Sequence, residues 1–255
     1  MAKKRRTNRL ALVLAAVFFL VLVVAIAVAT MPATVLASRL PSVNPDLTMR
    51  GAEGSVWNGS GRIAFRAVDL GTLSWQVKPW SVVTFSPQAS LTLQDDQHQA
   101  SAVVRAPSQQ QLEIDNLQFE MNAERLRQLQ VVDFGTLLGQ LSGQFDRVRF
   151  DQQVGLTELV GVARWHNAGW QSDIVVRLSD LEATFSPGLN SPVGDVRDLG
   201  GPLQVQGTIE FSGRQATTRL QLLGRGQDSR IDEALNWIGQ PTANGGRYLE
   251  IDSAF

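Results

Sequence analysis

The 255-residue sequence contains no cysteine, a single tyrosine and two histidines. Without cysteine, the chain has no disulfide, no thiolate nucleophile, no iron–sulfur cluster and no zinc site built on thiolates. Lysine is also scarce. Residues 10–255 contain 18 basic side chains, of which Lys78 is the only lysine and 17 are arginines. The sequence is therefore poor in cysteine, histidine, tyrosine and lysine, which often serve as nucleophiles or general bases.

The few candidates for catalysis or metal binding do not form a recognisable site. Asp95, Asp96 and His98 lie close together, but a polar hairpin tip explains them better than a metal site, since no second imidazole follows at a defined spacing. His166 lies in the segment 165–170, which we expect to be a turn between strands. Neither a phosphate-binding loop nor a nucleophile elbow is present. We therefore expect no enzymatic activity, no catalytic or metal-binding residues and no cofactor.

The 22 residues 10–31 carry no charge, and Thr30 is the only clearly polar residue among them. As a helix it would extend about 33 Å, which is enough to cross a hydrocarbon core of about 30 Å. The preceding residues 1–9 include five basic side chains, and such clusters mark the cytoplasmic side. We therefore expect a cytoplasmic tail (1–9), a transmembrane helix (10–31) and a domain outside the cytoplasm. The alternative is a cleaved signal peptide ending at Ala37, but its apolar core would be unusually long.

Charge is distributed unevenly beyond this segment. All 24 acidic residues follow residue 31, against 18 basic ones, which gives residues 32–255 a net charge of −6. Binding to nucleic acid and flat adsorption onto anionic lipid both need a clustered positive surface. The balance of charge therefore argues against both.

Apolar and polar residues alternate over much of the remaining chain, which is typical of half-buried strands. Glycine, proline, asparagine and aspartate separate these segments at hairpin-like distances. No helices alternate regularly with the strands, so we predict a mainly β domain with an antiparallel sheet. The alternating segments are 62–68, 73–77, 89–93, 112–114, 203–211 and 218–222, followed by a last strand over 247–251.

Three segments depart from the strand pattern. Residues 32–50 contain Pro41 and Pro45 and are expected to form a stalk between the membrane and the domain. Residues 123–130 and 228–238 place apolar side chains at helical spacing, which predicts one or two short helices.

A weak internal repeat indicates two related β units. A glycine followed by two tryptophans at the same spacing occurs as Gly71–Trp75–Trp80 and again as Gly161–Trp165–Trp170. We assign residues 51–135 to the first unit and 136–255 to the second. Units stacked along one axis would form a curved, gutter-like antiparallel sheet.

Tryptophans are the most informative candidates for a partner-binding or structural role. Each buries a large apolar area and needs a hydrogen-bond acceptor for its N–H. They could fill the space between strands, or face a groove or a partner, where tryptophan is enriched. The candidate residues are Trp57 with its neighbours Asn58 and Gly59, and Trp75, Trp80, Trp165 and Trp170.

Several motifs occur together in the order seen in a known family. The basic N-terminus and the anchor are followed by Gly-Ser-Val-Trp-Asn-Gly-Ser-Gly (54–61) and by Leu73-x-Trp75-x-Val77-x-Pro79. Near the C-terminus come Ile-Asp-Glu-Ala-Leu-Asn-Trp-Ile-Gly (231–239) and Gly-Gly-Arg-Tyr-Leu-Glu-Ile (245–251). In these motifs the sequence resembles the N component of the bacterial type II (general) secretion system, the GspN family.

The resemblance implies a non-enzymatic role at the bacterial inner membrane. Family members are single-pass inner-membrane proteins with a periplasmic β-rich domain, thought to assist the inner-membrane platform and its link to the outer-membrane secretin. It therefore implies an accessory or scaffold subunit whose partners are other secretion proteins. The alternative from the residues themselves is a periplasmic protein that binds lipid or another hydrophobic ligand in an open β groove.

Overall fold

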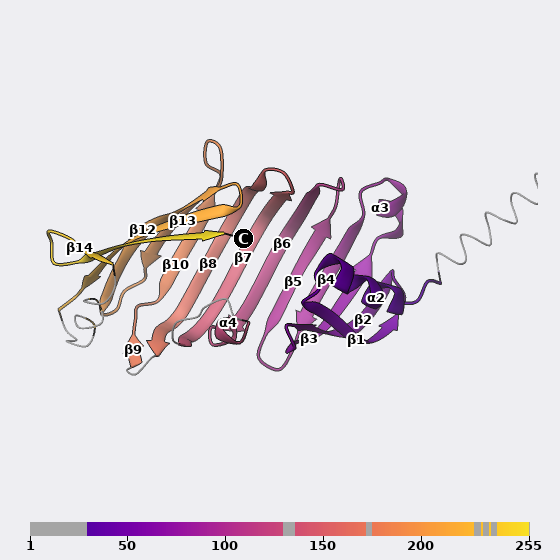
Figure 1. The fold of residues 1–255 in the computed structure, drawn as a ribbon, viewed down its shortest axis with the longest axis horizontal. Coiled ribbons are helices and arrows are strands. Elements are labelled where there is room, and N and C mark those ends of the chain that lie inside the picture. Colours follow the sequence, from indigo (N-terminus) through magenta and orange to yellow (C-terminus); the bar gives the residue numbers. More distant parts are fainter. Residues whose placement is uncertain are drawn as a thin grey trace, which may run out of the picture.

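The computed structural model describes residues 30–129, 136–171, 175–226, 231, 235 and 239–254. Within these residues the chain forms one antiparallel sheet of 15 strands with a few short helices (Figure 1). Strands follow one another across the sheet in chain order, except that β9 pairs with β8 beside the main path and β15 precedes β14 at the far edge. The prediction of a mainly β, open antiparallel architecture is confirmed.

Short connections join most neighbouring strands, and the two longest strands, β7 and β8, pair with each other near the middle of the sheet. The strands are β1 (Leu47–Gly54), β2 (Asn58–Phe65), β3 (Val68–Val77), β4 (Gln88–Gln94), β5 (Gln99–Arg105), β6 (Gln111–Asn122), β7 (Thr136–Asp151), β8 (Gly155–Gln171), β9 (Val175–Arg177), β10 (Leu181–Ser186), β11 (Val193–Asp198), β12 (Leu203–Ser212), β13 (Gln215–Gly224), β14 (Gln240–Pro241) and β15 (Arg247–Ala254). The helices are α2 (Thr34–Val43), α3 (Pro79–Val83) and α4 (Arg125–Gln128).

The register of the sheet assigns its side chains to two faces, because directly paired residues point to the same side. Trp75, Phe119, Phe145 and Leu222 lie on one side, which we call the apolar face. The opposite side, which includes Glu182 and which we call the polar face, is dominated by Arg, Glu, Gln, Ser and Thr. The alternation in the sequence thus produces one apolar and one polar face.

Two N-terminal segments differ from expectation. The alternating segment 62–68 is not one strand, because Arg66 and Ala67 adopt φ values of 47° and 68° and form the turn between β2 and β3. The expected stalk over 32–50 instead contains α2 and the start of β1. Helix α2 packs against β1 and half-buries Leu36 and Leu40, so apolar contact holds this segment in a helix even though Pro41 lies inside it.

The prediction of a turn over 165–170 is wrong, because these residues belong to β8. Asn167, with φ of 48°, lies close to Gly139, with φ of 100°, where the register of the β7–β8 pair shifts. A Cβ at position 139 would come within 2.3 Å of the His166 carbonyl oxygen, so only glycine fits there. The irregularity therefore bends the two strands without ending them.

Helix α4 confirms the short helix predicted within 123–130. Of the segment 228–238 only Ile231 and Leu235 are described; both are helical and buried, and the rest, with Trp237, lies outside the described residues. The predicted span over 10–31 also lies outside them, apart from Thr30 and Met31. In the part of the chain that the structure describes, no helix has the length and apolarity needed to cross a membrane.

The division into units 51–135 and 136–255 stays a prediction. Its boundary falls between β6 and β7. These two strands pair along their length, from Gln111 with Asp151 to Asn122 with Gln140, with a single interruption. The sheet therefore continues across the proposed boundary.

Candidate functional site

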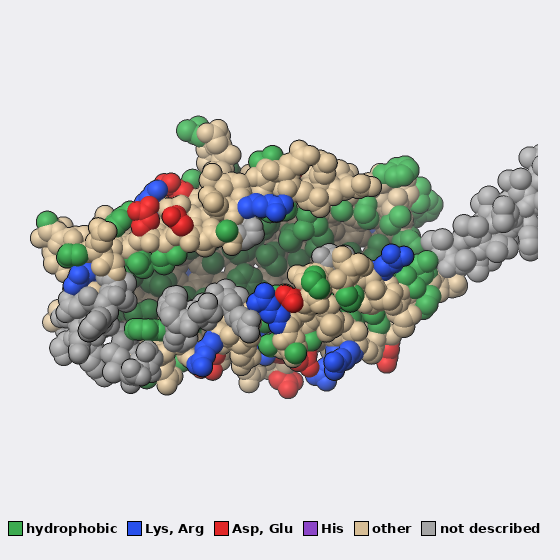
Figure 2. Space-filling view, viewed as in Figure 1, with side chains coloured by type: hydrophobic (Ala, Val, Ile, Leu, Met, Phe, Trp, Pro, Cys, Tyr) green, Lys and Arg blue, Asp and Glu red, His purple; other side chains and the backbone are tan. Residues whose placement is uncertain are grey.

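The apolar face lines a hollow that runs along the curved sheet (Figure 2). Hydrophobic side chains gather in this hollow, whereas most visible charged side chains lie on its rims. In the middle of the sheet Phe145 is buried, but the apolar face around it is only half-buried, as at Leu117, Phe119, Ala163 and Phe185. Such a surface is available to a ligand or to a partner protein.

Four phenylalanines form a row across the apolar face. The ring centroids of Phe119 and Phe145 are 6.3 Å apart, those of Phe145 and Phe185 are 5.6 Å apart, and those of Phe185 and Phe211 are 6.2 Å apart. These are contact distances for aromatic pairs. The rings lie over glycines of neighbouring strands, namely Gly143, Gly161 and Gly194. The row therefore joins β6, β7, β10 and β12 through side-chain contacts that supplement the backbone hydrogen bonds.

The apolar face is more fully buried toward the two ends of the sheet. Near the C-terminal end, five residues form a buried cluster: Leu203, Val205, Leu222, Ile231 and Leu235. At the other end, α2 packs against β1 (Figure 1). The half-buried part of the apolar face therefore lies between them.

Trp75 packs on the tight bend between β1 and β2 and has only 6% of its surface exposed. Its Nε1 donates a hydrogen bond to the Ser55 carbonyl oxygen (3.1 Å). The ring lies so close to Gly59 that a Cβ added there would be 2.6 Å from Trp75 Cζ2. The backbone amides of Trp57 and Asn58 both donate to Ser55 Oγ. The segment Trp57–Asn58–Gly59 thus shapes the bend that receives Trp75.

Trp165 repeats part of this arrangement on β8. Its Nε1 donates to the Leu138 carbonyl oxygen (2.8 Å), immediately before the irregularity at Gly139. Trp75 and Trp165 lie on β3 and β8, with four strands between them. The structure therefore places them in two separate packing sites rather than in one shared site.

The second tryptophan of each repeat has a different environment. Trp170 is half-buried beside the C-terminal cluster. Trp80, in α3, is 80% exposed. Of the tryptophans singled out from the sequence, Trp80 is thus the one whose side chain lies mainly in solvent.

On the polar face, ionic pairs bridge neighbouring strands. The buried Glu182 accepts hydrogen bonds from Arg197 Nη2 (2.6 Å) and from Arg164 Nε (2.8 Å). These bonds, from Arg197 first and Arg164 second, hold the pKa of the Glu182 carboxyl below its ordinary value. Two further networks join Arg149 to Glu113 and Glu158, and Arg219 to Glu210 and Glu250. Arginine here stabilises strand pairing, where its planar fork suits carboxylates.

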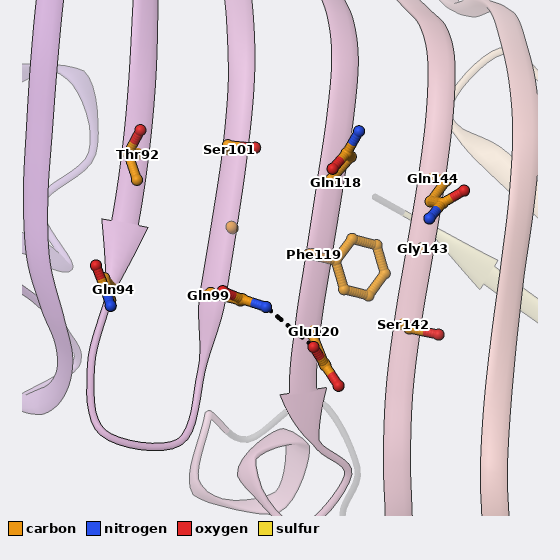
Figure 3. Close-up of a pocket in the computed structure, with 11 residues that line it drawn as sticks. Thr92, Gln94, Gln99, Ser101, Gln118, Phe119, Glu120, Ser142, Gly143 and Gln144 are labelled. Atoms are coloured by element: carbon orange, nitrogen blue, oxygen red, sulfur yellow. Dashed lines mark hydrogen bonds between the residues drawn. The ribbon is translucent and has the colours of Figure 1, made fainter.

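A polar depression of about 350 Å³ lies over β4 to β7 (Figure 3). The short side chains of Thr92, Ser101 and Ser142 leave space between longer glutamines. Gln99 Nε2 donates to Glu120 Oε2 (3.0 Å) at its lower end in the figure. Among the described residues that line the depression, Glu120 is the only ionisable one, so this lining has no pair of groups for general acid–base chemistry.

The acidic and histidine residues considered from the sequence have local structural partners. Asp95 Oδ1 accepts hydrogen bonds from the backbone amides of Gln97 and His98, each 2.7 Å long, in the hairpin turn between β4 and β5. His166 Nδ1 lies 3.2 Å from Asp180 Oδ2. No group of three or more His, Cys, Asp or Glu side chains able to hold a metal ion occurs among the residues that the structure describes.

The sheet is open, with β1 at one edge and β14 at the other. β14 pairs only with Arg247 and Tyr248 of β15. From Leu249 to Ala254, β15 pairs with β13 on one side, and no described strand pairs with it on the other. A strand edge of this kind can accept a strand from another protein.

Two features were not anticipated from the sequence. One is the phenylalanine row, which depends on the register of several strands. The other is an exposed apolar cluster in and next to α3. It consists of Trp80, Val82, Val83 and Phe85, of which only Trp80 is among the candidates from the sequence. The run from Trp80 to Phe85 contains no charged residue, which was the available signal for such a cluster.

Comparison with known proteins supports the family resemblance. The model of the family described as type II secretion system (T2SS), protein N, matches residues 45–250. A type II secretion system protein N of Aeromonas hydrophila is 31% identical over 84 residues, which cover 32% of this chain and only 33% of that protein. No solved structure matches. Because the family match extends from the segment before β1 into β15, the chain belongs to the type II secretion system protein N family.

Proposed function

We propose that this chain is a non-enzymatic accessory or scaffold subunit of the bacterial type II secretion machine. In this role it helps to assemble or stabilise the inner-membrane platform and its periplasmic link to the secretin. Membership of the protein N family carries the proposal. The open edge of β15 and the half-buried apolar face support it, because both are suited to contact with other proteins.

The proposed location is the inner membrane, with residues 1–9 in the cytoplasm, 10–31 in the bilayer and the sheet in the periplasm. The five basic residues before residue 10 and the absence of charge over 10–31 support this topology. Met31 lies against the bend between β1 and β2, since Val56 N donates to its carbonyl oxygen (3.0 Å) and Pro32 bridges to Ser55. The sheet would therefore begin close to the membrane surface.

Deletion of the gene in a strain that uses this secretion machine is expected to lower the recovered platform complex and exoprotein release several-fold. Loss of a stabilising subunit shifts an assembly toward free subunits, which are removed by proteolysis. The measurement is quantification of platform proteins after detergent extraction and of exoprotein in the medium. The full chain should restore both, and unchanged levels in the deletion strain would refute the proposal.

A second candidate function is the binding of lipid or another hydrophobic ligand in the hollow. The half-buried apolar side chains along the middle of the sheet favour it. Ligand sites are concave and mostly apolar, and the apolar face has both properties in Figure 2. This function would also be compatible with a place in the secretion machine.

An aromatic side chain placed in the hollow is expected to reduce the amount of lipid that co-purifies with the protein several-fold. Ala183 lies on the apolar face between Ala163 and Val196, so Ala183→Phe would occupy the space of an acyl chain. The matched control is Thr184→Phe, on the polar face of the same strand. Mass spectrometry of lipid extracts provides the comparison, and equal lipid in both variants and the wild type would count against this function.

A further inference from the structure

The connection between β3 and β4 carries apolar side chains that point into solvent. It contains α3, in which no residue is buried. Trp80 is 80%, Val83 65% and Phe85 88% exposed. Large apolar side chains that cluster on a surface mark a site of interaction.

This connection is held in the conformation that exposes the cluster. Ser81 Oγ donates to the Lys78 carbonyl oxygen (2.5 Å) and accepts from Gln88 N (2.8 Å). Ser86 N donates to the Ser81 carbonyl oxygen (2.9 Å). Phe85 adopts a φ of 58°, which is rare for an aromatic residue. The exposure of the cluster is therefore part of the fold.

The cluster lies close to the point where the chain, on leaving the proposed membrane span, first contacts the sheet. Val56 N donates to the Met31 carbonyl oxygen (3.0 Å), and Val77 N donates to the Trp57 carbonyl oxygen (2.7 Å). The adjacent residues Val56 and Trp57 thus connect Met31 with Val77, which lies two residues before the start of α3. Figure 1 shows α3 and the indigo start of the described chain at the same end of the sheet.

The charge around α3 suits a lipid surface. Residues 70–94 contain no acidic side chain, and Lys78 is their only charged residue, in a domain that is otherwise net acidic. Tryptophan is enriched at the membrane–water interface. A lysine can extend its charged end toward lipid phosphates while its stem stays in apolar surroundings.

We propose that α3 and Phe85 form a second contact with the bilayer that holds the anchor. Trp80, Val83 and Phe85 enter the interfacial layer, and Lys78 meets lipid phosphates. This inference rests on the proposed membrane span over 10–31. Anchor and cluster together would orient the sheet, with the α3 end of β4 toward the membrane and the opposite hairpin turn, at Gln97, away from it.

The test uses single cysteines in the full-length chain, which has none of its own. Val83→Cys and the matched control Gln97→Cys, at the other end of β4, are labelled with an environment-sensitive fluorophore. Each protein is reconstituted into vesicles of phosphatidylethanolamine and phosphatidylglycerol, with and without lipids that carry a quencher near the headgroup. The label at position 83 is expected to lose about half of its emission to the quencher, and the label at 97 almost none.

A second variant isolates the role of the cluster. Trp80→Gln with Phe85→Asn, in the Val83→Cys background, should still float with the vesicles through the anchor but should lose most of the quenching. Equal quenching at 83 and 97 in protein that floats with the vesicles would overturn the second contact and leave the anchor intact. Failure of the chain to float at all would refute the anchor, and the inference with it. Protection of the Val83→Cys thiol from labelling in native membranes, without quenching in vesicles, would overturn it in favour of a protein partner.

Discussion

Replacement of Trp75 by alanine is expected to lower the free energy of unfolding by about 3–5 kcal/mol, the range for large aromatic residues removed from a core. Trp75 is the one buried tryptophan among the described residues. The substitution removes its packing against Gly59 and its hydrogen bond to the Ser55 carbonyl oxygen. Urea unfolding of the full chain in detergent, followed by circular dichroism, measures the loss.

Two companion variants separate the causes of this loss. Trp75→Phe keeps a ring in the bend but removes the Nε1 donor, so it should cost roughly 1 kcal/mol for the hydrogen bond together with a smaller packing loss. Trp80→Ala changes the exposed tryptophan of the same motif and should alter stability by no more than about 0.5 kcal/mol. Similar losses for Trp75→Ala and Trp80→Ala would contradict the assignment of Trp75 to the packed bend and Trp80 to the surface.

The strands with regular alternation were predictable from the sequence. The segments 203–211 and 218–222 fall within β12 and β13, which pair in an uninterrupted register from Leu203 with Gly224 to Ser212 with Gln215. Alternation predicts these strands correctly because one face of the sheet is apolar and the other is polar. The polarity of each residue therefore indicates the face on which its side chain lies. The class of fold follows from such segments.

Local irregularities were not predictable, because tertiary contacts decide them. The turn at Arg66 and Ala67 carries neither glycine nor asparagine in its positive-φ positions, so the alternating pattern continues through it without a turn signal. The segment 165–170 has turn-like residues, yet the irregularity opposite Gly139 lets β8 continue. Helix α2 contains Pro41, and its packing against β1 overrides that local signal.

The sequence identified the tryptophans as candidates but did not distinguish their environments. Trp75 and Trp80 belong to one motif, and the face that each occupies depends on where β3 ends and α3 begins. The edge of β15 depends on the order of strands across the whole sheet. Periodicity within one strand contains no information about its neighbours.

We propose that the sheet acts by contacting other proteins of the secretion machine. Ile251 lies on β15 beyond the part covered by β14, and its side chain is 44% exposed. A cysteine at this position would lie at the edge most suited to strand addition. Gln206→Cys, which is exposed on the polar face of an interior strand, is the matched control.

The decisive measurement for this contact is cross-linking from Ile251→Cys in intact cells, followed by mass spectrometry of the adducts. The expected result is a strong adduct with a platform protein or the secretin, at least about tenfold more abundant than from Gln206→Cys, since a paired edge holds its partner within reach. The contradicting result is the absence of any secretion protein from the adducts of Ile251→Cys, or the same weak adducts from both positions.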